Sequence, residues 1–419
     1  MNRAYYLMQL VLVSPMSVGS GESRFTDHDI ALDSRGLPFI PATAIAGVFR
    51  HFLGEGCAEL FGSIETDKGE PSHIIFYDAC ETNHTFTTTR DCVVMKDGEK
   101  TAKDKAKFDL QAEETNAVFE TVIELDEVGC KFADELETAI AALNSGVIRF
   151  GAKTSRGYGE ARVRELYRAQ FTLPHDADRW LDFDMFSCGD SCYESIAPAQ
   201  SSFSRYTRIM LSLSQKGGIS IRQYTTERQE NQNKAEGKGA NYKHISLYSD
   251  DPDKPGVPVI PGTSWAGAFR SRYSEFMGTE KRDELFGFVK EKSGESRASR
   301  IIFSESQLSA YTQKEITRNS VDRFSGGVKH SSLYTEKAVF NGKCTLEIAV
   351  KDAADEELAA LCAVICDLDR GYLAVGGLTA VGRGLFRVDR MTVNGAEVTQ
   401  ALKSGDIDSM KGRGAHDGR

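Results

Sequence analysis

The residue pattern with the most specific chemistry is a glycine-rich loop that reads GAKTSRGYGEARV. Its glycines let backbone N–H groups approach a phosphate chain closely, and its lysine and arginine add positive charge. The alternative is a flexible turn that carries surface charge. The pattern predicts a phosphate-binding loop, and its glycines and cations are Gly151, Lys153, Arg156, Gly157 and Gly159.

A related loop follows 225 residues later and reads GYLAVGGLTAVGRGLFRV. It keeps Gly376, Gly377, Gly382 and Arg383 but loses most of the charge of the first loop. We expect it to contact phosphates through its backbone and through Arg383.

Two further segments, PFIPATAIAGVFR and PVIPGTSWAGAFR, read as a strand that ends in Ile-Pro and turns into a short helix. Thr43 and Thr263 can cap these helices, and the N-terminal amides of a helix face anions. Arg50 and Arg270 end the motif at equal positions. We expect phosphate contacts from all four residues; the alternative for either arginine is a surface charge near a helix C-terminus.

These motifs occur twice because the chain repeats itself. Five pairs of segments match in one order, at offsets of 220 to 228 residues: the two Ile-Pro motifs, ELFG with ELFG, IIFYDA with IIFSES, TTRDCVV with ITRNSVD, and the two glycine-rich loops. Such self-similarity indicates two copies of one domain.

Each copy has the same expected order: a strand, a short helix, two strands around a polar excursion, a strand, an amphipathic helix and a last strand. This order predicts an α+β, ferredoxin-like unit. The expected strands are 5–13, 119–125, 207–214 and 344–350, and the expected amphipathic helices are 131–143 and 356–368.

The repeat sets the expected domain boundaries. We expect a first domain over 1–168, a partly structured linker over 169–205, a second domain over 206–391 and a C-terminal tail over 392–419. Residues 228–243 are polar and predict a mobile loop inserted in the second copy.

Composition limits the function classes. The formal net charge of −10 over 419 residues argues against a simple basic nucleic-acid coat, but it leaves RNA binding through local basic grooves open. No run of about 20 apolar residues occurs, so we expect no membrane partner.

Nine cysteines without a CxxC pair fit a reducing, cytoplasmic compartment. Two CxxxC pairs occur, Cys188 with Cys192 and Cys362 with Cys366. We expect buried structural thiols, with zinc binding as the alternative.

The run IPATAIAGVFR, the paired ELFG segments and GAKTSRGYGEARV resemble the RAMP superfamily of CRISPR systems, over 1–165 and 207–390. The chain is similar to the repeating backbone subunits of type III effector complexes, and its two fused copies resemble the double-domain subunit of type III-D systems. The family motifs are IPG(S/T)-S-x-x-G-x-x-R and G-G-x-x-x-R-G-x-G. The chain departs from them at Ala42, where the motif has glycine, and at Val381, where the first copy is basic.

This resemblance implies two tandem ferredoxin-like (RNA-recognition-motif-like) RAMP domains, each with an inserted β-hairpin thumb. Such subunits stack along a guide RNA (crRNA) with other RAMP subunits and the large polymerase-like subunit, and the thumbs kink the duplex of guide and target RNA. Here the thumbs would span 90–109 and 318–337, and Arg90 and Arg318 would contact RNA. The first thumb is nearly neutral, so shape rather than charge argues for it.

The loop SGESRFTDHDIALDSRG holds the residues that the resemblance implies for catalysis. Asp33 begins a hairpin turn and is structural by its position, and Asp29 belongs to a short strand over 29–32. The best match to the catalytic aspartate is Asp27, which would hold Mg²⁺ or another divalent cation for RNA cleavage by the neighbouring 2′-hydroxyl. His28 could help in proton transfer, with a plain surface role as the alternative. Without catalysis, Asp27 is a loop carboxylate.

The second copy has no carboxylate at this place. Alignment puts Tyr242 opposite Asp27, and the acids of the longer second loop, Asp250, Asp251 and Asp253, lie in its turn. We therefore expect one cutting site and one binding-only site.

Two other functions stay open. A structural filament subunit without activity would share every binding feature and differ only at Asp27. A stand-alone RAMP guide-processing endoribonuclease would need a general base near a glycine-rich loop, and neither loop contains a histidine.

Overall fold

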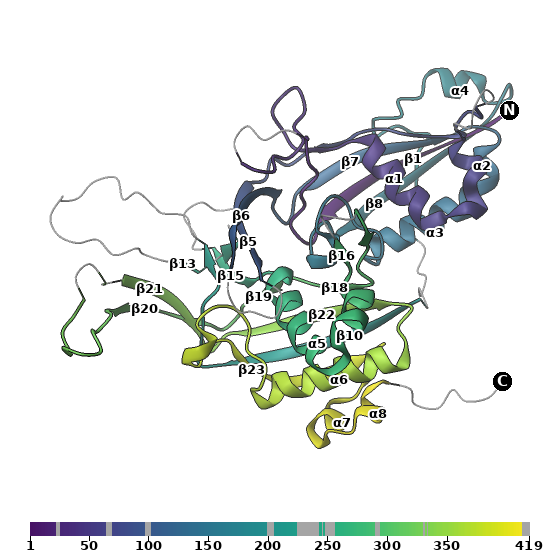
Figure 1. Cartoon of the computed structure of the whole chain (residues 1–419). Coiled ribbons are helices and arrows are strands. Elements are labelled where there is room, and N and C mark those ends of the chain that lie inside the picture. Colours follow the sequence, from purple (N-terminus) through teal and green to yellow (C-terminus); the bar gives the residue numbers. More distant parts are fainter. Residues whose placement is uncertain are drawn as a thin grey trace, which may run out of the picture. The chain divides into compact units, whose positions relative to one another are not determined.

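The computed structural model describes residues 1–21, 26–63, 69–96, 102–198, 205–223, 243–244, 246–247, 256–289, 294–329, 332 and 334–412. By its internal contacts the chain divides into two compact units (Figure 1). The first comprises Met1–Arg90, Asp109–Thr154 and Tyr158–Phe203, and the second comprises Asp91–Phe108, Ser155–Gly157 and Ser204–Arg419.

The first unit is built on one sheet of long and short strands in the order β2-β4-β7-β1-β8-β9, with β3 also paired to β7. The long central strands β7, β1 and β8 are antiparallel. The strands are β1 (Asn2–Leu12), β2 (Phe39–Ile40), β3 (Ile74–Phe76), β4 (Ala79–Glu81), β7 (Val118–Leu125), β8 (Ala161–Thr172) and β9 (Glu194–Ser195).

Helices cover one face of this sheet (Figure 1). Because side chains alternate along a strand, Tyr6, Met8 and Leu10 of β1 face the helices and join Phe49 and Ile140 in the core. The helices are α1 (Ala42–Leu53), η1 (Glu55–Cys57), α2 (Ala58–Phe61), η2 (Gly129–Phe132) and α3 (Ala133–Asn144). A further short helix, η3 (Thr154–Arg156), lies in the glycine-rich loop.

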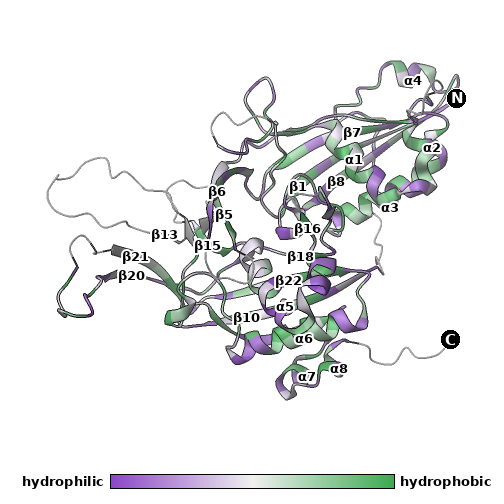
Figure 2. Cartoon of the chain, viewed as in Figure 1, coloured by the Kyte–Doolittle hydropathy of each residue, from purple (hydrophilic) through white to green (hydrophobic). Residues whose placement is uncertain are grey.

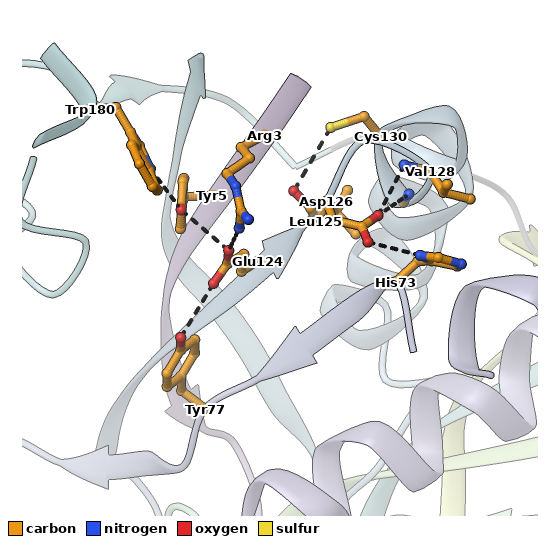
Figure 3. Close-up of polar contacts among 11 residues, drawn as sticks. Arg3, Tyr5, His73, Tyr77, Glu124, Leu125, Asp126, Val128, Cys130 and Trp180 are labelled. Carbon is orange, nitrogen blue, oxygen red and sulfur yellow. Dashed lines mark hydrogen bonds and ion pairs between the residues drawn. The ribbon is translucent and has the colours of Figure 1, made fainter. Parts of the chain in front are cut away.

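The other face of the first sheet is covered by the segment after β8, which includes α4 (Ala177–Leu181). Tyr5 and Leu7 pack there against Trp180 and Phe183. A hydrogen bond also holds this segment on the sheet, because the Trp180 indole N–H donates to the Tyr5 hydroxyl over 3.0 Å (Figure 3). The expected linker over 169–205 thus differs from the structure, since β8 runs to Thr172 and the next segment completes this unit.

A buried carboxylate anchors this polar network. The Tyr5 hydroxyl donates to Glu124 over 3.3 Å, the Tyr77 hydroxyl donates to the second Glu124 oxygen over 3.3 Å, and Arg3 forms an ion pair with it (Figure 3). Charged hydrogen bonds of this kind are stronger than neutral ones.

The second unit repeats the plan with a sheet in the order β18-β22-β10-β23-β24. Its long strands β22, β10 and β23 are antiparallel. The strands of this sheet are β10 (Tyr206–Lys216), β18 (Ile301–Phe303), β22 (Lys343–Lys351), β23 (Leu385–Val393) and β24 (Ala396–Glu397).

Smaller sheets complete the unit. They comprise β11 (Gly218–Ile219), β12 (Arg222–Gln223), β13 (Lys243–His244), β14 (Ser246–Leu247), β15 (Val257–Ile260), β16 (Phe288–Val289), β17 (Ser296–Arg297) and β19 (Ser306–Gln307). β14, β15 and β19 form one sheet, β12 pairs with β13, and β16 pairs with β17.

Helices α5 (Gly262–Phe286) and α6 (Asp355–Arg370) pack on this sheet. Helix α6 is amphipathic: hydrophobic and hydrophilic residues are interspersed along it (Figure 2), and its apolar face is buried. Trp265 is buried in this core and Phe49 in that of the first unit.

The C-terminal region continues the fold beyond the expected boundary at 391. β23 forms a hairpin with β24, and α7 (Thr399–Ser404) and α8 (Ile407–Met410) follow. Leu402 and Met410 are buried in the core of the second unit, which explains why this part of the expected tail is ordered.

A β-hairpin is inserted at the same place in each copy. β5 (Thr87–Met95) pairs with β6 (Ala102–Glu113), and β20 (Thr312–Arg318) pairs antiparallel with β21 (Tyr334–Phe340). Both sheets also shift register at one position of the first strand, between Gln9 and Leu10 and between Ser212 and Leu213. The repeat predicted from the sequence therefore extends to a matching β-bulge.

Trp180→Ala should lower the free energy of unfolding by about 2 kcal/mol, because it removes both aromatic packing and the bond to Tyr5. The matched control is the neighbouring Leu181→Ala, which should change little because this side chain is 74% exposed. Denaturant unfolding of both variants measures the difference. Equal losses would show that the segment does not stabilise the sheet.

Candidate functional site

Close backbone contacts explain two glycines of the first loop. A Cβ at Gly159 would lie 1.8 Å from the carbonyl oxygen of Phe150, and a Cβ at Gly151 would lie 2.3 Å from that of Ser17. Both glycines also have positive φ angles, of 73° and 76°. Any other residue at Gly151 or Gly159 would displace the loop from the end of the sheet.

The second loop makes the same contacts. A Cβ at Gly384 would lie 2.0 Å from the carbonyl oxygen of Val375, and a Cβ at Gly376 would lie 2.8 Å from that of Ser220. Of the other glycines predicted to bind RNA, Gly377 and Gly382 are exposed, whereas Gly157 is buried. The loops are thus equivalent in backbone geometry, and their RNA contacts stay a prediction.

Arg383 is buried in an ion pair with the hairpin strand of the second unit, β21 (Tyr334–Phe340). Its side chain is 4% exposed and forms an ion pair with the buried Glu336 at 3.1 Å, while its guanidinium lies 5.4 Å from the centre of the Phe340 ring. The buried ion pair fastens the glycine-rich loop to the hairpin strand β21, and the RNA contact of Arg383 stays a prediction.

Arg90 is buried in the same way at the root of the first hairpin. It forms an ion pair with Glu114 at 3.0 Å, and both side chains are at most 5% exposed. Its guanidinium lies 5.9 Å from the centre of the Tyr158 ring. In this arrangement Arg90 joins the hairpin to the glycine-rich loop, and its RNA contact stays a prediction.

The exposed carboxylate of Asp27 lies beside the same hairpin. Its Oδ2 accepts a hydrogen bond from the backbone N–H of Asp109 over 2.9 Å. The adjacent His28 forms a parallel bridge with Leu110, and its carbonyl oxygen accepts from the N–H of Gln111 over 3.0 Å. Backbone pairing to β6 thus fixes the position of Asp27.

Asp29 has a structural role. It is 7% exposed, and its Oδ1 accepts from both the backbone N–H and the hydroxyl of Thr26, over 2.8 and 2.7 Å. The expected strand over 29–32 is reduced to isolated bridges of Ile30 and Leu32. Asp33 begins the predicted turn, and the N–H of Leu37 donates to its carboxylate over 2.9 Å, which lowers the pKa of Asp33.

A cluster of buried acids that was not predicted from the sequence lies at the root of the first hairpin. Glu81, Glu113 and Glu114 are each at most 4% exposed. The Thr85 hydroxyl lies 2.9 Å from Glu81 Oε1 and also contacts Glu113 Oε1. One hydroxyl hydrogen cannot serve two carboxylates, so both contacts are satisfied only when one carboxyl group is protonated.

Glu113 is the group whose protonated form the environment favours most clearly. Burial raises the pKa of Glu113 to about 7, and the neighbouring Glu81 adds to this rise, while hydrogen bonds from Thr85 and Thr87 oppose it. The charge of Arg90 is matched by Glu114. The only sequence signal of the cluster was three threonines at 85, 87 and 88, which is too common a pattern to single out.

The helices after the Ile-Pro turns begin differently from the prediction. Pro41 and Pro261 occupy the N-cap positions, and neither cap makes a side-chain hydrogen bond, so Thr43 and Thr263 do not cap. In the first unit the Asp78 carboxylate accepts from the N–H of Ala42 over 2.7 Å. An internal anion therefore already occupies this helix N-terminus.

The remaining predicted cations have different surroundings. Arg50 is exposed in the last turn of α1, whereas Arg270 donates to the Gly287 carbonyl and to Asp283, each over 2.8 Å. The two arginines at equal motif positions thus differ in role. Lys153, Arg156 and Arg318 are half-buried.

Several predictions of the second copy concern residues outside those that the structure describes: Tyr242, the acids Asp250, Asp251 and Asp253, and residues 228–242 of the expected loop over 228–243.

The described residues contain no group of three or more His, Cys, Asp or Glu side chains that could hold a metal ion. Cys362 and Cys366 are buried, as expected, while Cys188 is exposed and Cys192 half-buried. Among the described residues, no helix is both long and apolar enough to cross a membrane.

Comparison with protein families decides the assignment. The model of the RAMP superfamily matches residues 9–162 and 244–387, together more than half of the chain. The chain belongs to the RAMP superfamily. The two matches fall on the two copies, which confirms a tandem RAMP protein and points to a CRISPR-associated role in RNA binding. A search of curated protein sequences finds no significant match.

The stability of this RAMP protein should fall as the pH rises from about 4.5 to about 7. In this range native Glu113 keeps a proton that the unfolded chain releases, so folding is favoured at the acidic end and the contribution is lost above the native pKa. Glu113→Gln mimics the protonated group and should remove this dependence, stabilising the protein above neutral pH by the order of 2 kcal/mol.

Denaturant unfolding at several pH values measures this effect. The control Glu120→Gln changes a half-buried glutamate of β7 that bonds Gln9, and should keep the wild-type pH profile. An unchanged profile in Glu113→Gln would mean that Glu113 is ionised in the native protein at neutral pH.

Proposed function

We propose that this chain is a guide-RNA-binding backbone subunit of a type III CRISPR interference complex, and that its first unit cleaves target RNA with a divalent metal ion. The observation that carries the proposal is the duplicated RAMP unit, in which each copy has a glycine-rich loop closed onto its sheet and an inserted hairpin. The proposed partners are guide RNA, target RNA, other RAMP subunits and the large polymerase-like subunit.

In this proposal each unit is a ferredoxin-like palm. The strand orders β3-β7-β1-β8 and β18-β22-β10-β23 support this fold, because both place the first strand of the unit between its third and its last. The hairpins β5–β6 and β20–β21 would be the thumbs. Buried ion pairs at the root of each, Arg90 with Glu114 and Arg383 with Glu336, support rigid thumbs.

Cleavage would depend on Asp27. Mg²⁺ is commonly held by one or two carboxylates together with substrate phosphates, and an exposed carboxylate fits such a shared site. Bound there, the metal ion would supply positive charge against the charge that develops on the attacked phosphate. The N–H of Asp109 orients the Asp27 carboxylate, and RNA would complete the ligand set.

The full chain should bind single-stranded RNA despite its net charge of −10, with an affinity that falls as salt concentration rises, because bound phosphates release counterions. Fluorescence anisotropy with labelled RNA in a KCl series measures this. The proposal fails if the protein, alone and with its complex partners, shows no affinity for RNA at low salt.

Asp27→Asn should reduce cleavage at one target position by at least about 100-fold in the assembled complex, because the amide keeps the bond to Asp109 but loses the charge that holds the metal ion. Binding of guide and target should persist. The assay follows end-labelled target RNA with magnesium and scores the loss of one product.

The matched control is Asp134→Asn, which removes an exposed carboxylate from α3. Asp29 is unsuitable as a control because its loss would release Thr26 and the loop. A normal rate in Asp27→Asn would leave the first unit with a binding role only.

A further inference from the structure

The sheet of the second unit presents one polar, exposed face. Leu211 and Leu213 of β10 are buried in the core with α5 and α6, so the alternating residues between and beyond them face the opposite side. On that side β10 carries Met210, which is 40% exposed, and the half-buried Ser212 and Ser214.

Three cations meet at one end of this face. Ser214 of β10 is paired with Lys343 of β22 on one side and with Arg387 of β23 on the other. Lys216 lies two residues beyond Ser214 on the same side of β10. All three cations are exposed, and none has an ion-pair partner among the residues that the structure describes. We call Lys216, Lys343 and Arg387 the β10 cation group.

Nearby acids do not cancel this charge. Asp389, at the bulge of β23, accepts a hydrogen bond from the Ser214 hydroxyl. Glu347 is already paired with Arg208. Three cations thus stand against one carboxylate, on the surface of a chain whose net charge is −10. Because neighbouring strands are about 4.8 Å apart, Lys343 and Arg387 are separated by roughly 10 Å and can hold different phosphates.

The β10 cation group adjoins the second glycine-rich loop. Lys216 is paired with Leu385, which directly follows Gly384, and the N–H of Gly384 donates to the Gly218 carbonyl over 2.9 Å. A phosphate chain lying along the exposed backbone of Gly376, Gly377 and Gly382 can therefore continue onto these cations.

The first unit does not repeat this surface. There Val11 is paired with Val118 and Arg162, and Val13 follows at the position of Lys216. Three of the four positions around the sheet end are valine, and Arg162 lies 3.9 Å from Glu160. The group is therefore specific to the second unit and is no consequence of the shared fold.

We propose that the β10 cation group binds the phosphate backbone of guide RNA on the open face of the second sheet. The inference rests on the proposed function, and it assigns to the second unit an RNA contact outside the glycine-rich loop. Charge complementarity favours a polyanion, and continuity with the glycine-rich loop favours the guide strand.

The test compares two full-length triple variants. Lys216→Gln, Lys343→Gln and Arg387→Gln together remove the β10 cation group. The control variant removes the same charge from three exposed positions elsewhere in the second unit. Its substitutions are Lys281→Gln in α5, Arg297→Gln in β17 and Arg370→Gln in α6. Each protein is titrated with labelled guide RNA in a KCl series, and circular dichroism checks that both variants are folded.

The first variant should bind guide RNA roughly 10-fold more weakly than wild type, and the slope of log affinity against log salt should shrink by roughly 2, because three phosphate contacts are lost. The control variant should keep the wild-type slope. If wild type binds RNA and both variants match it, the cation group is not an RNA site although the proposed function stands.

If wild type itself does not bind, the proposed function fails. If the first variant keeps the wild-type affinity for RNA but its complex loses an acidic protein subunit, the group is a protein interface and the proposal is wrong.

Discussion

In each unit the loop before the last long strand returns onto its own sheet through a contact that only glycine permits. The carbonyl oxygens of Phe150 and Val375 lie where a Cβ at Gly159 and Gly384 would be, at 1.8 and 2.0 Å. This close approach sets the end of β8 and β23, and it brings the residue before each glycine, Tyr158 and Arg383, against the hairpin root.

The two units then stabilise that root with the same chemistry from different elements. In the first unit the arginine lies on a hairpin strand and the aromatic ring on the loop. In the second unit the arginine lies on the loop and the ring, Phe340, on a hairpin strand. Each arginine is matched by a buried glutamate. Since removing one partner of a buried ion pair is strongly destabilising, these pairs hold the hairpins in a defined direction.

The units differ in the faces that they leave open. The first covers the second face of its sheet with the aromatic segment around Trp180, whereas the second exposes serines and cations there. The exposed carboxylate of Asp27 occurs in the first unit, beside β6. A duplicated fold has thus diverged in surface chemistry, which agrees with the different roles proposed for the two copies.

Much of this architecture could be predicted from the sequence. The repeat and the alternation of apolar residues placed the long strands and both amphipathic helices, because these patterns report directly on burial. Roles of charged residues could not be predicted so well. Arg90 and Arg383 were expected to contact RNA, and their burial beside Glu114 and Glu336 was not foreseen because these partners lie 24 and 47 residues away along the chain.

Two expectations about local structure differ from the structure for the same reason. The cap of α1 comes from Asp78, 36 residues from Ala42, and Thr43 has no part in it. The expected linker packs on the sheet because its aromatic residues meet Tyr5, 175 residues from Trp180. Local sequence determines which elements form, and long-range partners decide which polar groups stay available for function.

The most direct measurement is the sequencing of nucleic acid that co-purifies with the untagged chain and its native partners. The account predicts RNA of uniform length whose sequence derives from a CRISPR array and whose release requires high salt or protein denaturation. A complex that carries no RNA, or only fragments of random cellular sequence, would contradict it.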